Sequence, residues 1–112
     1  MGFLAFANST ATAQDALKAA PNNQKLLVDS DGVRMIKGWL KPGEVLPMHS
    51  HPFYEVYVLS GGEITATNAD GTKKVLTYKT GDAYAAHSVT HTIKNTGKTT
   101  VEFILVEVKD KK

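Results

Sequence analysis

Turn-forming residue pairs recur at short intervals along this chain, and their spacing constrains the fold more than any other feature of the sequence. The pairs that contain glycine are Asp31-Gly32, Pro42-Gly43, Gly61-Gly62, Asp70-Gly71 and Gly81-Asp82. The residues between them are largely β-branched, aromatic or aliphatic, as is typical of β-strands. Short strands at this spacing, with no helical pattern between them, predict an antiparallel sandwich or barrel.

The same pattern gives approximate bounds for the strands. The expected ranges are 25–30, 33–40, 54–59, 63–68, 73–78, 83–86, 91–95 and 100–109. Asp70-Gly71 has the composition that favours a tight hairpin turn. The last range is long and apolar, and an exposed edge strand of this kind is often paired with a second subunit.

Residues 1–24 precede this pattern, and we expect them to form an N-terminal arm or helix beside a single domain over residues 25–112. Ser9 or Thr10 can cap a short helix over residues 11–20. Proline and asparagine after that range are typical of a helix end. The strands, and any site that they build, therefore belong to the second region.

The start of the chain has two interpretations. Residues 2–7 are apolar, and Ala11-Thr12-Ala13 has the small-residue pattern of a signal-peptide cleavage site. Residues 1–13 are therefore either the remnant of a signal peptide or an arm that packs its apolar residues on a partner. A cytoplasmic location and a periplasmic or secreted one both remain open.

Composition narrows the classes of function. The chain has 112 residues, which suffice for one hydrophobic core, and its net charge of +2 is spread among scattered acidic and basic residues. It shows no basic footprint for nucleic acid and no run of about 20 apolar residues for a membrane helix. It has no cysteine, which excludes disulfides, thiolate zinc sites and cysteine nucleophiles.

Three of the four histidines combine with one glutamate in a pattern suited to a metal. Alternate residues of a β-strand point to the same face, so His49 and His51 can direct both rings at one ion. Glu55 follows Pro52, which interrupts strand pairing and allows a bend. His91 must come from a distant strand. Three imidazoles and a carboxylate form a ligand set for a divalent transition metal.

These residues resemble the two motifs of the cupin superfamily. The first motif has a glycine, five residues, His-x-His, three or four residues, a glutamate, six residues and a glycine, and its counterparts here are Gly43, His49, His51, Glu55 and Gly62. The second begins with Gly-Asp and ends with a histidine and, four positions later, an asparagine. Its counterparts here are Gly81-Asp82, His91 and Asn95.

The resemblance implies a small single-domain cupin, with an all-β antiparallel jelly-roll barrel of the RmlC-like kind and a bound metal. The implied ligands are His49, His51, Glu55 and His91, and the implied ion is Fe, Mn, Ni, Co or Zn. The implied activity is that of a metal-dependent enzyme acting on a small molecule, as an oxidoreductase of the dioxygenase type, an isomerase or a lyase. A non-catalytic module that binds a small ligand through the metal is the alternative. Small cupins commonly form homodimers.

Three residues are candidates for catalytic roles beside the metal. Glu55 could detach from the ion and act as a base. His87, four residues before His91, stands where the family usually has proline; it could shuttle protons or pack in a loop. Tyr57 shares strand parity with Glu55, so we expect it to line the same interior, where its hydroxyl could hold a substrate unless it is a core tyrosine.

Overall fold

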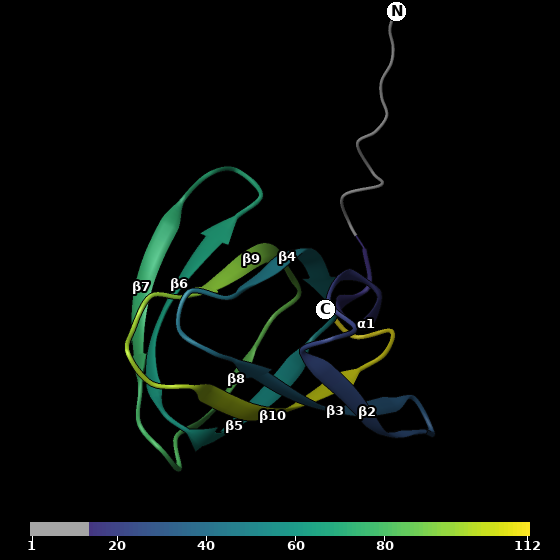
Figure 1. Cartoon of the computed structure of the whole chain (residues 1–112). Coiled ribbons are helices and arrows are strands. Elements are labelled where there is room, and N and C mark those ends of the chain that lie inside the picture. The colour runs from purple at the N-terminus through teal and green to yellow at the C-terminus, as the bar shows by residue number, and fades with distance from the viewer. Residues whose placement is uncertain (1–13) are drawn as a thin grey trace, which may run out of the picture.

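The computed structural model describes residues 14–112, in which nine strands and one short helix form a jelly roll (Figure 1). The elements are α1 (Ala16–Ala19), β2 (Gln24–Ser30), β3 (Val33–Leu40), β4 (Val45–His51), β5 (Tyr54–Ser60), β6 (Gly62–Asn68), β7 (Lys73–Tyr78), β8 (Ala83–Ala86), β9 (Val89–Asn95) and β10 (Val101–Val108). The predicted all-β antiparallel class is confirmed, and each expected strand appears with ends shifted by two residues at most.

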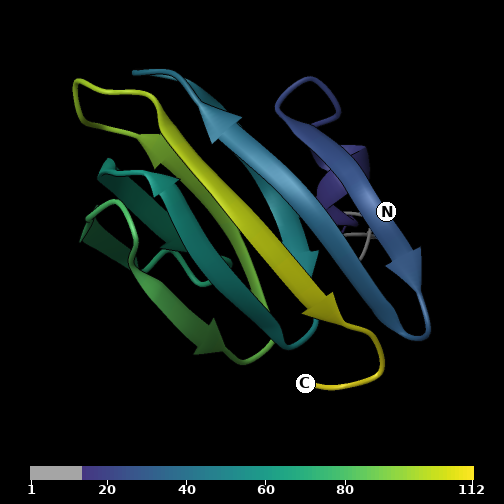
Figure 2. The same ribbon diagram turned by 90° about the horizontal axis from the view of Figure 1, so that it is seen from below.

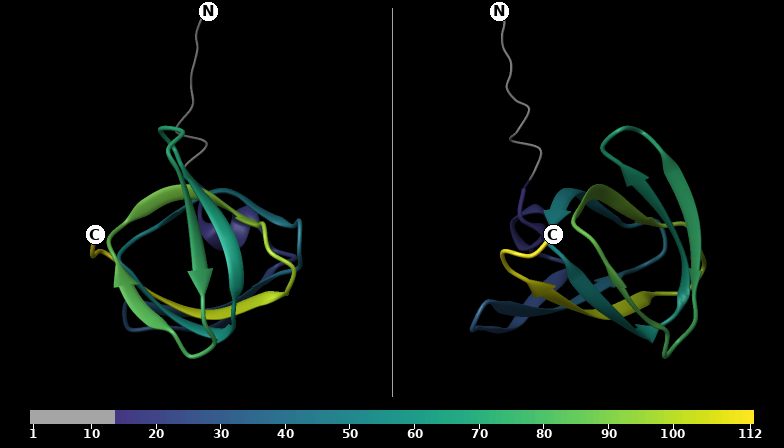
Figure 3. Two further views of the ribbon diagram at one scale, coloured as in Figure 1. Left: turned by 90° about the vertical axis from the view of Figure 1, so that its left-hand side faces the viewer. Right: turned by 180° about the vertical axis from the view of Figure 1, so that it is seen from behind.

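The strands form two facing sheets. One has five strands in the order β2-β3-β10-β5-β8, seen face on in Figure 2, and the other has four in the order β4-β9-β6-β7. Every named strand pair is antiparallel. The sheets remain separate rather than closing into one continuous barrel. Figure 3 shows that α1 lies at one end of this body and the β6–β7 hairpin at the other.

The last strand does not lie at an edge. β10 pairs with β3 on one side and with β5 on the other, so its backbone groups are used within the chain. This placement corrects the expectation that the last strand could be an exposed edge. Its inward residues Val101 and Leu105 are buried between the sheets, whereas its outward residues Ile104 and Val106 are half-buried.

Two hydrophobic clusters fill the space between the sheets. The first contains Ile36, Tyr54, Val56, Val58 and Leu105, and the second contains Ala20, Leu40 and Leu46. Burial of each large side chain contributes about 1.5–3 kcal/mol to folding. Phe103 packs against both clusters, and its ring lies directly over Gly38 of β3, where a Cβ atom would come within 2.6 Å of it.

The described part of the N-terminal region ends in a helix that is shorter than expected. Its cap is Asp15, whose carboxylate accepts a hydrogen bond from the Leu17 N–H at 3.1 Å. The expected caps Ser9 and Thr10, like the possible signal remnant over residues 1–13, lie outside the described residues. Within residues 14–112, no helix has the length and apolar character that a membrane crossing requires.

Candidate metal centre

Three histidines converge between the two sheets. β4 carries His49 and His51 on its buried face, and β9 carries His91 directly opposite His49 in the strand pairing. The three side chains are buried, and one nitrogen from each lies within 4.8 Å of the others. This arrangement agrees with the expectation that His49 and His51 of one strand would meet His91 from a distant strand.

Hydrogen bonds fix two of the rings in the tautomer that a metal requires. The Nδ1–H of His49 donates to the Pro47 carbonyl at 2.6 Å, because a carbonyl oxygen can only accept. The Nδ1–H of His51 donates to a carboxylate oxygen of Glu107, also at 2.6 Å. In both rings Nε2 therefore keeps its lone pair for an ion, as is usual for metal-binding histidines.

Burial keeps His49 and His91 uncharged. Removal from water lowers the pKa of His49 to about 4, and the neighbouring His51 adds to this effect. The same two causes, burial and the adjacent imidazoles, lower the pKa of His91 to about 3. Both rings are thus neutral at pH 7, which is the state that binds metal. The site has the geometry, tautomers and charge state that fit a divalent transition ion.

Glu55 does not join the three imidazoles. After the bend at Pro52 and Phe53, β5 begins at Tyr54, and its buried positions are Tyr54, Val56 and Val58. Glu55 and Tyr57 therefore face outward, and Tyr57 is 49% exposed. The expectations that Glu55 is a ligand or a base and that Tyr57 lines the interior are corrected by this strand parity.

Tyr54 takes the inward position next to the site. Its ring centre lies 4.8 Å from that of His51, and burial raises the pKa of its phenol well above the ordinary value. The group beside the imidazoles is therefore a neutral hydroxyl-bearing ring rather than a carboxylate. Tyr54 directly precedes Glu55 in sequence. The expected inward residue and the observed one therefore differ by a single position along β5.

His87 lies outside the cluster. It is exposed, its ring packs edge-on against Phe53, and its Nδ1–H donates to the Lys112 carbonyl at 3.2 Å. These contacts describe a histidine that packs a loop, which was one of the two interpretations. A catalytic role beside the metal has no geometric support, because His87 lines neither of the cavities at the site.

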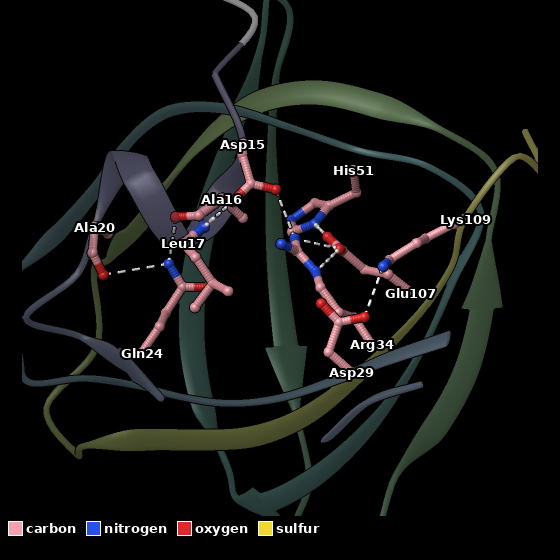
Figure 4. Close-up of polar contacts among 10 residues, drawn as sticks. All are labelled: Asp15, Ala16, Leu17, Ala20, Gln24, Asp29, Arg34, His51, Glu107 and Lys109. Carbon is pink, nitrogen blue, oxygen red and sulfur yellow. Dashed lines mark hydrogen bonds and ion pairs between the residues drawn. The ribbon is translucent and has the colours of Figure 1, made fainter. Parts of the chain in front are cut away.

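A row of charged residues behind His51 was not expected from the sequence (Figure 4). One oxygen of Glu107 accepts from His51, and the other accepts from Arg34 Nη2 at 2.6 Å and Arg34 Nε at 3.0 Å. Arg34 Nη2 also donates to Asp15 at 2.6 Å. Burial alone would raise the pKa of Glu107, but the hydrogen bonds from His51 and Arg34 hold it below its usual range. Glu107 is therefore an ionised carboxylate that orients His51.

The sequence does contain a signal for this row. Glu107 follows Val101, Phe103 and Leu105 at alternate positions of β10, so strand parity places an acidic group on the apolar inner face. Arg34 stands directly opposite it on β3. A buried carboxylate needs a cationic or hydrogen-bonding partner, and an arginine at the paired position of the neighbouring strand supplies one.

Two neighbouring cavities, which share five lining residues, lie at the histidines. The inner one, of about 50 Å³, has room for one or two water molecules, and the three imidazoles and Tyr54 line it. The outer one, of about 320 Å³, also reaches His91 and Tyr54, and it is bounded by residues of β6 and β7. Small molecules can therefore approach the cluster from the hairpin end, whereas α1 covers the opposite end.

Comparisons with known proteins agree with this architecture. A family model described as "Cupin domain" matches residues 39–107. No curated protein sequence matches the chain significantly. Among solved structures, a cupin domain from Bordetella pertussis is 22% identical, with a TM-score of 0.70, and the match covers 77% of this chain and 91% of that one.

Two further solved structures have the same fold. An RmlC-like cupin family protein with a double-stranded β-helix fold, from Methanocaldococcus jannaschii, is 24% identical, with a TM-score of 0.62 and coverage of 77% of this chain and 80% of that one. A cupin superfamily protein from Desulfitobacterium hafniense is 20% identical, with a TM-score of 0.60 and coverage of 78% and 76%. The match of the family model over most of the chain, together with the jelly roll and its buried histidines, shows that this protein belongs to the cupin family.

Proposed function

We propose that the protein is a metal-dependent enzyme that acts on a small molecule, with His49, His51 and His91 as the protein ligands. The observation that carries this proposal is the convergence of three buried imidazoles beside a cavity that has room for a small molecule. Iron, manganese, nickel, cobalt and zinc all accept such a nitrogen set, and affinity alone does not choose among them.

The residues around the histidines have separable tasks. Glu107 and the Pro47 carbonyl hold two of the rings in place, so that little reorganisation accompanies metal binding. Tyr54 limits the space beside His51, and its phenol can donate a hydrogen bond to a bound molecule. The bound ion would act as a Lewis acid and would leave positions open for water or substrate.

The charge of the ligand set bears on the chemistry. Three neutral imidazoles leave the two positive charges of a divalent ion without an anionic ligand from the protein. Glu107 offsets part of this charge from behind His51, without facing the cavity. The site therefore favours substrates or products that bring an anionic oxygen to the ion.

Elemental analysis of protein purified without chelator or histidine tag is the direct test. We expect about one equivalent of a divalent transition metal per chain. If the metal is iron, oxygen uptake with catechols, diketones and thiols is the first screen; if it is zinc or nickel, isomerase and lyase substrates come first. Metal-dependent turnover that His49→Ala abolishes would support the enzyme, and absence of any bound metal after titration would contradict the proposal.

A non-catalytic binding module is the second candidate. The cavity linings contain no carboxylate, and burial raises the pKa of Tyr54, Tyr78 and Tyr84 above the ordinary value. Among the described residues that line the two cavities, the imidazoles are therefore the side chains closest to an ordinary general base, beside Lys74 and the three phenols. Tight binding of metal and a small ligand without turnover would favour this second function.

We also propose that the protein forms a homodimer through the outer face of the five-stranded sheet. Tyr57 and Leu59 of β5 and Val28 of β2 are 49%, 37% and 48% exposed on or beside this face. Ile104 and Val106 of β10 line a shallow groove beside Tyr57. An apolar surface of this extent favours association.

Light scattering after gel filtration tests the dimer. We expect twice the monomer mass for the native chain and the monomer mass for Tyr57→Lys, because the substitution buries a charge in the interface. Val75→Lys is the matched control, since Val75 is 62% exposed on the other sheet. A monomeric native chain, or dissociation by both variants alike, would refute this interface.

A further inference from the structure

The outer cavity reaches one member of the histidine cluster, His91. Its walls are Tyr54, Ala66, Lys74, Leu76, Tyr78, Tyr84, His91 and Ile93, and five of these residues also line the inner cavity. Its volume of about 320 Å³ is at the lower end of the range for small-molecule sites. A molecule that reaches His91 must therefore be small and must pass between these side chains.

Lys74 stands on the inner face of the four-stranded sheet, on the same side as the cluster. Lys74 pairs with Ala66 of β6, and Ala66 pairs in turn with Ile93 of β9. His91 is two residues from Ile93 on the same face. Two strand spacings and two residues along a strand separate the Cα atoms of Lys74 and His91 by about 12 Å. A flexible lysine side chain can span much of this distance, so a compact ligand can contact both the Lys74 ammonium group and the His91 ring.

The cavity is positively charged at its outer end. Lys74 is the only charged side chain in its lining apart from the titratable His91. Within residues 14–112 the ion pairs involve Arg34, Lys37, His51 and Lys109, and none involves Lys74. Its ammonium group is therefore available to an anion that enters the cavity.

The remaining walls suit a flat or compact apolar body. Leu76 and Ile93 are aliphatic, and the rings of Tyr78 and Tyr84 stack with their centres 5.8 Å apart. The two hydroxyls lie 2.7 Å apart. One phenol donates to the other, so the accepting phenol keeps an O–H that can donate to a ligand. The walls thus provide apolar contact and one neutral donor beside a single cation.

We propose that the substrate or ligand is a small carboxylic acid with a compact apolar or aromatic body, whose carboxylate binds Lys74 while its other end faces the three histidines. This inference rests on the proposed metal-dependent function, and it names the chemical class that the site accepts. Two positive groups at opposite ends of the cavity, the ammonium and the ion, select an anionic molecule with a polar group at its far end.

Benzoate and benzyl alcohol are suitable probes, because they share a ring and differ in charge. Titration of the ¹⁵N-labelled full chain, both metal-free and zinc-loaded, should shift the backbone amide signals of Ala66 and Leu76 with benzoate. We expect benzyl alcohol to bind at least about tenfold more weakly, because it lacks the charged partner for Lys74. Lys74→Met should weaken benzoate binding by about tenfold or more.

Lys73→Met is the matched control, because Lys73 is adjacent in sequence but does not line the cavity. Its benzoate affinity should equal that of the native chain. Equal binding of the two probes, no binding of benzoate, or equal effects of the two lysine variants would overturn the inference. Zinc stoichiometry, measured separately, distinguishes the two proposals. Failure to bind zinc removes the proposed function, and the metal-free titration then decides whether the Lys74 carboxylate site exists.

Discussion

Replacing His91 with glutamine will abolish tight metal binding, whereas replacing Glu55 with glutamine will leave metal affinity unchanged. His91 supplies one of three converging nitrogens, while Glu55 faces outward from β5. Loss of a partner that merely orients a ligand costs about 10–100-fold in affinity, so loss of a ligand itself should exceed that range. Competition titration with a chromophoric zinc chelator measures both variants, and circular dichroism establishes that both remain folded.

The opposite result would show which residue of β5 points toward the histidines. If Glu55→Gln weakened zinc binding as strongly as His91→Gln, β5 would have to present Glu55 to the ion in place of Tyr54. Tyr54→Phe separates the cases further. In the observed register this variant removes only a hydroxyl next to His51. Zinc affinity should stay within a few fold of the native value, because the hydrogen bonds that orient His49 and His51 remain.

Replacing Arg34 with methionine will destabilise the fold by about 3–5 kcal/mol, because Glu107 remains as a buried carboxylate that has lost its cationic partner. The Glu107 side chain is 2% exposed and that of Arg34 is 14% exposed. Lys109→Met is the matched control. Its ion pair with Asp29 has the same length, 2.6 Å, but both side chains are at least 40% exposed, so the expected loss is about 1 kcal/mol or less.

Urea unfolding of the metal-free protein, followed by tryptophan fluorescence, gives both free energies of unfolding. Similar small losses in the two variants would mean that Glu107 retains enough stabilisation from His51 alone, and that Arg34 is dispensable. A large loss in both would point to a general effect of lost positive charge. Only the unequal result supports a buried charge row that depends on Arg34.

The sequence predicts the fold and the histidine cluster for simple geometric reasons. Turn pairs at short intervals mark eight of the nine strands along the chain, all except β4, and a separation of two residues places His49 and His51 on one face of β4. His91 is identifiable from the sequence because it supplies the third imidazole of the ligand set. Glu55 was misplaced because Pro52 and Phe53 interrupt the strand, and parity counted across a bend has no fixed phase.

The charge row behind His51 was harder to find. Arg34 and Glu107 are 73 positions apart, and they meet only because β10 lies between β3 and β5. Sequence spacing does not give that strand order. Asp15 is a further step away, since it joins the row from the helix cap through Arg34. Parity along β10 alone would have marked Glu107 as a buried acid without naming its partners.

Gly38 influences the size of the inner cavity although it does not line it. The ring of Phe103 rests on the bare backbone of Gly38, and the same ring forms part of the inner cavity wall. A methyl group at position 38 would displace the ring toward the histidines and reduce a space of about 50 Å³. The volume beside the three histidines thus depends on a missing side chain at position 38, and a substitution there would change this volume without any change among the histidines.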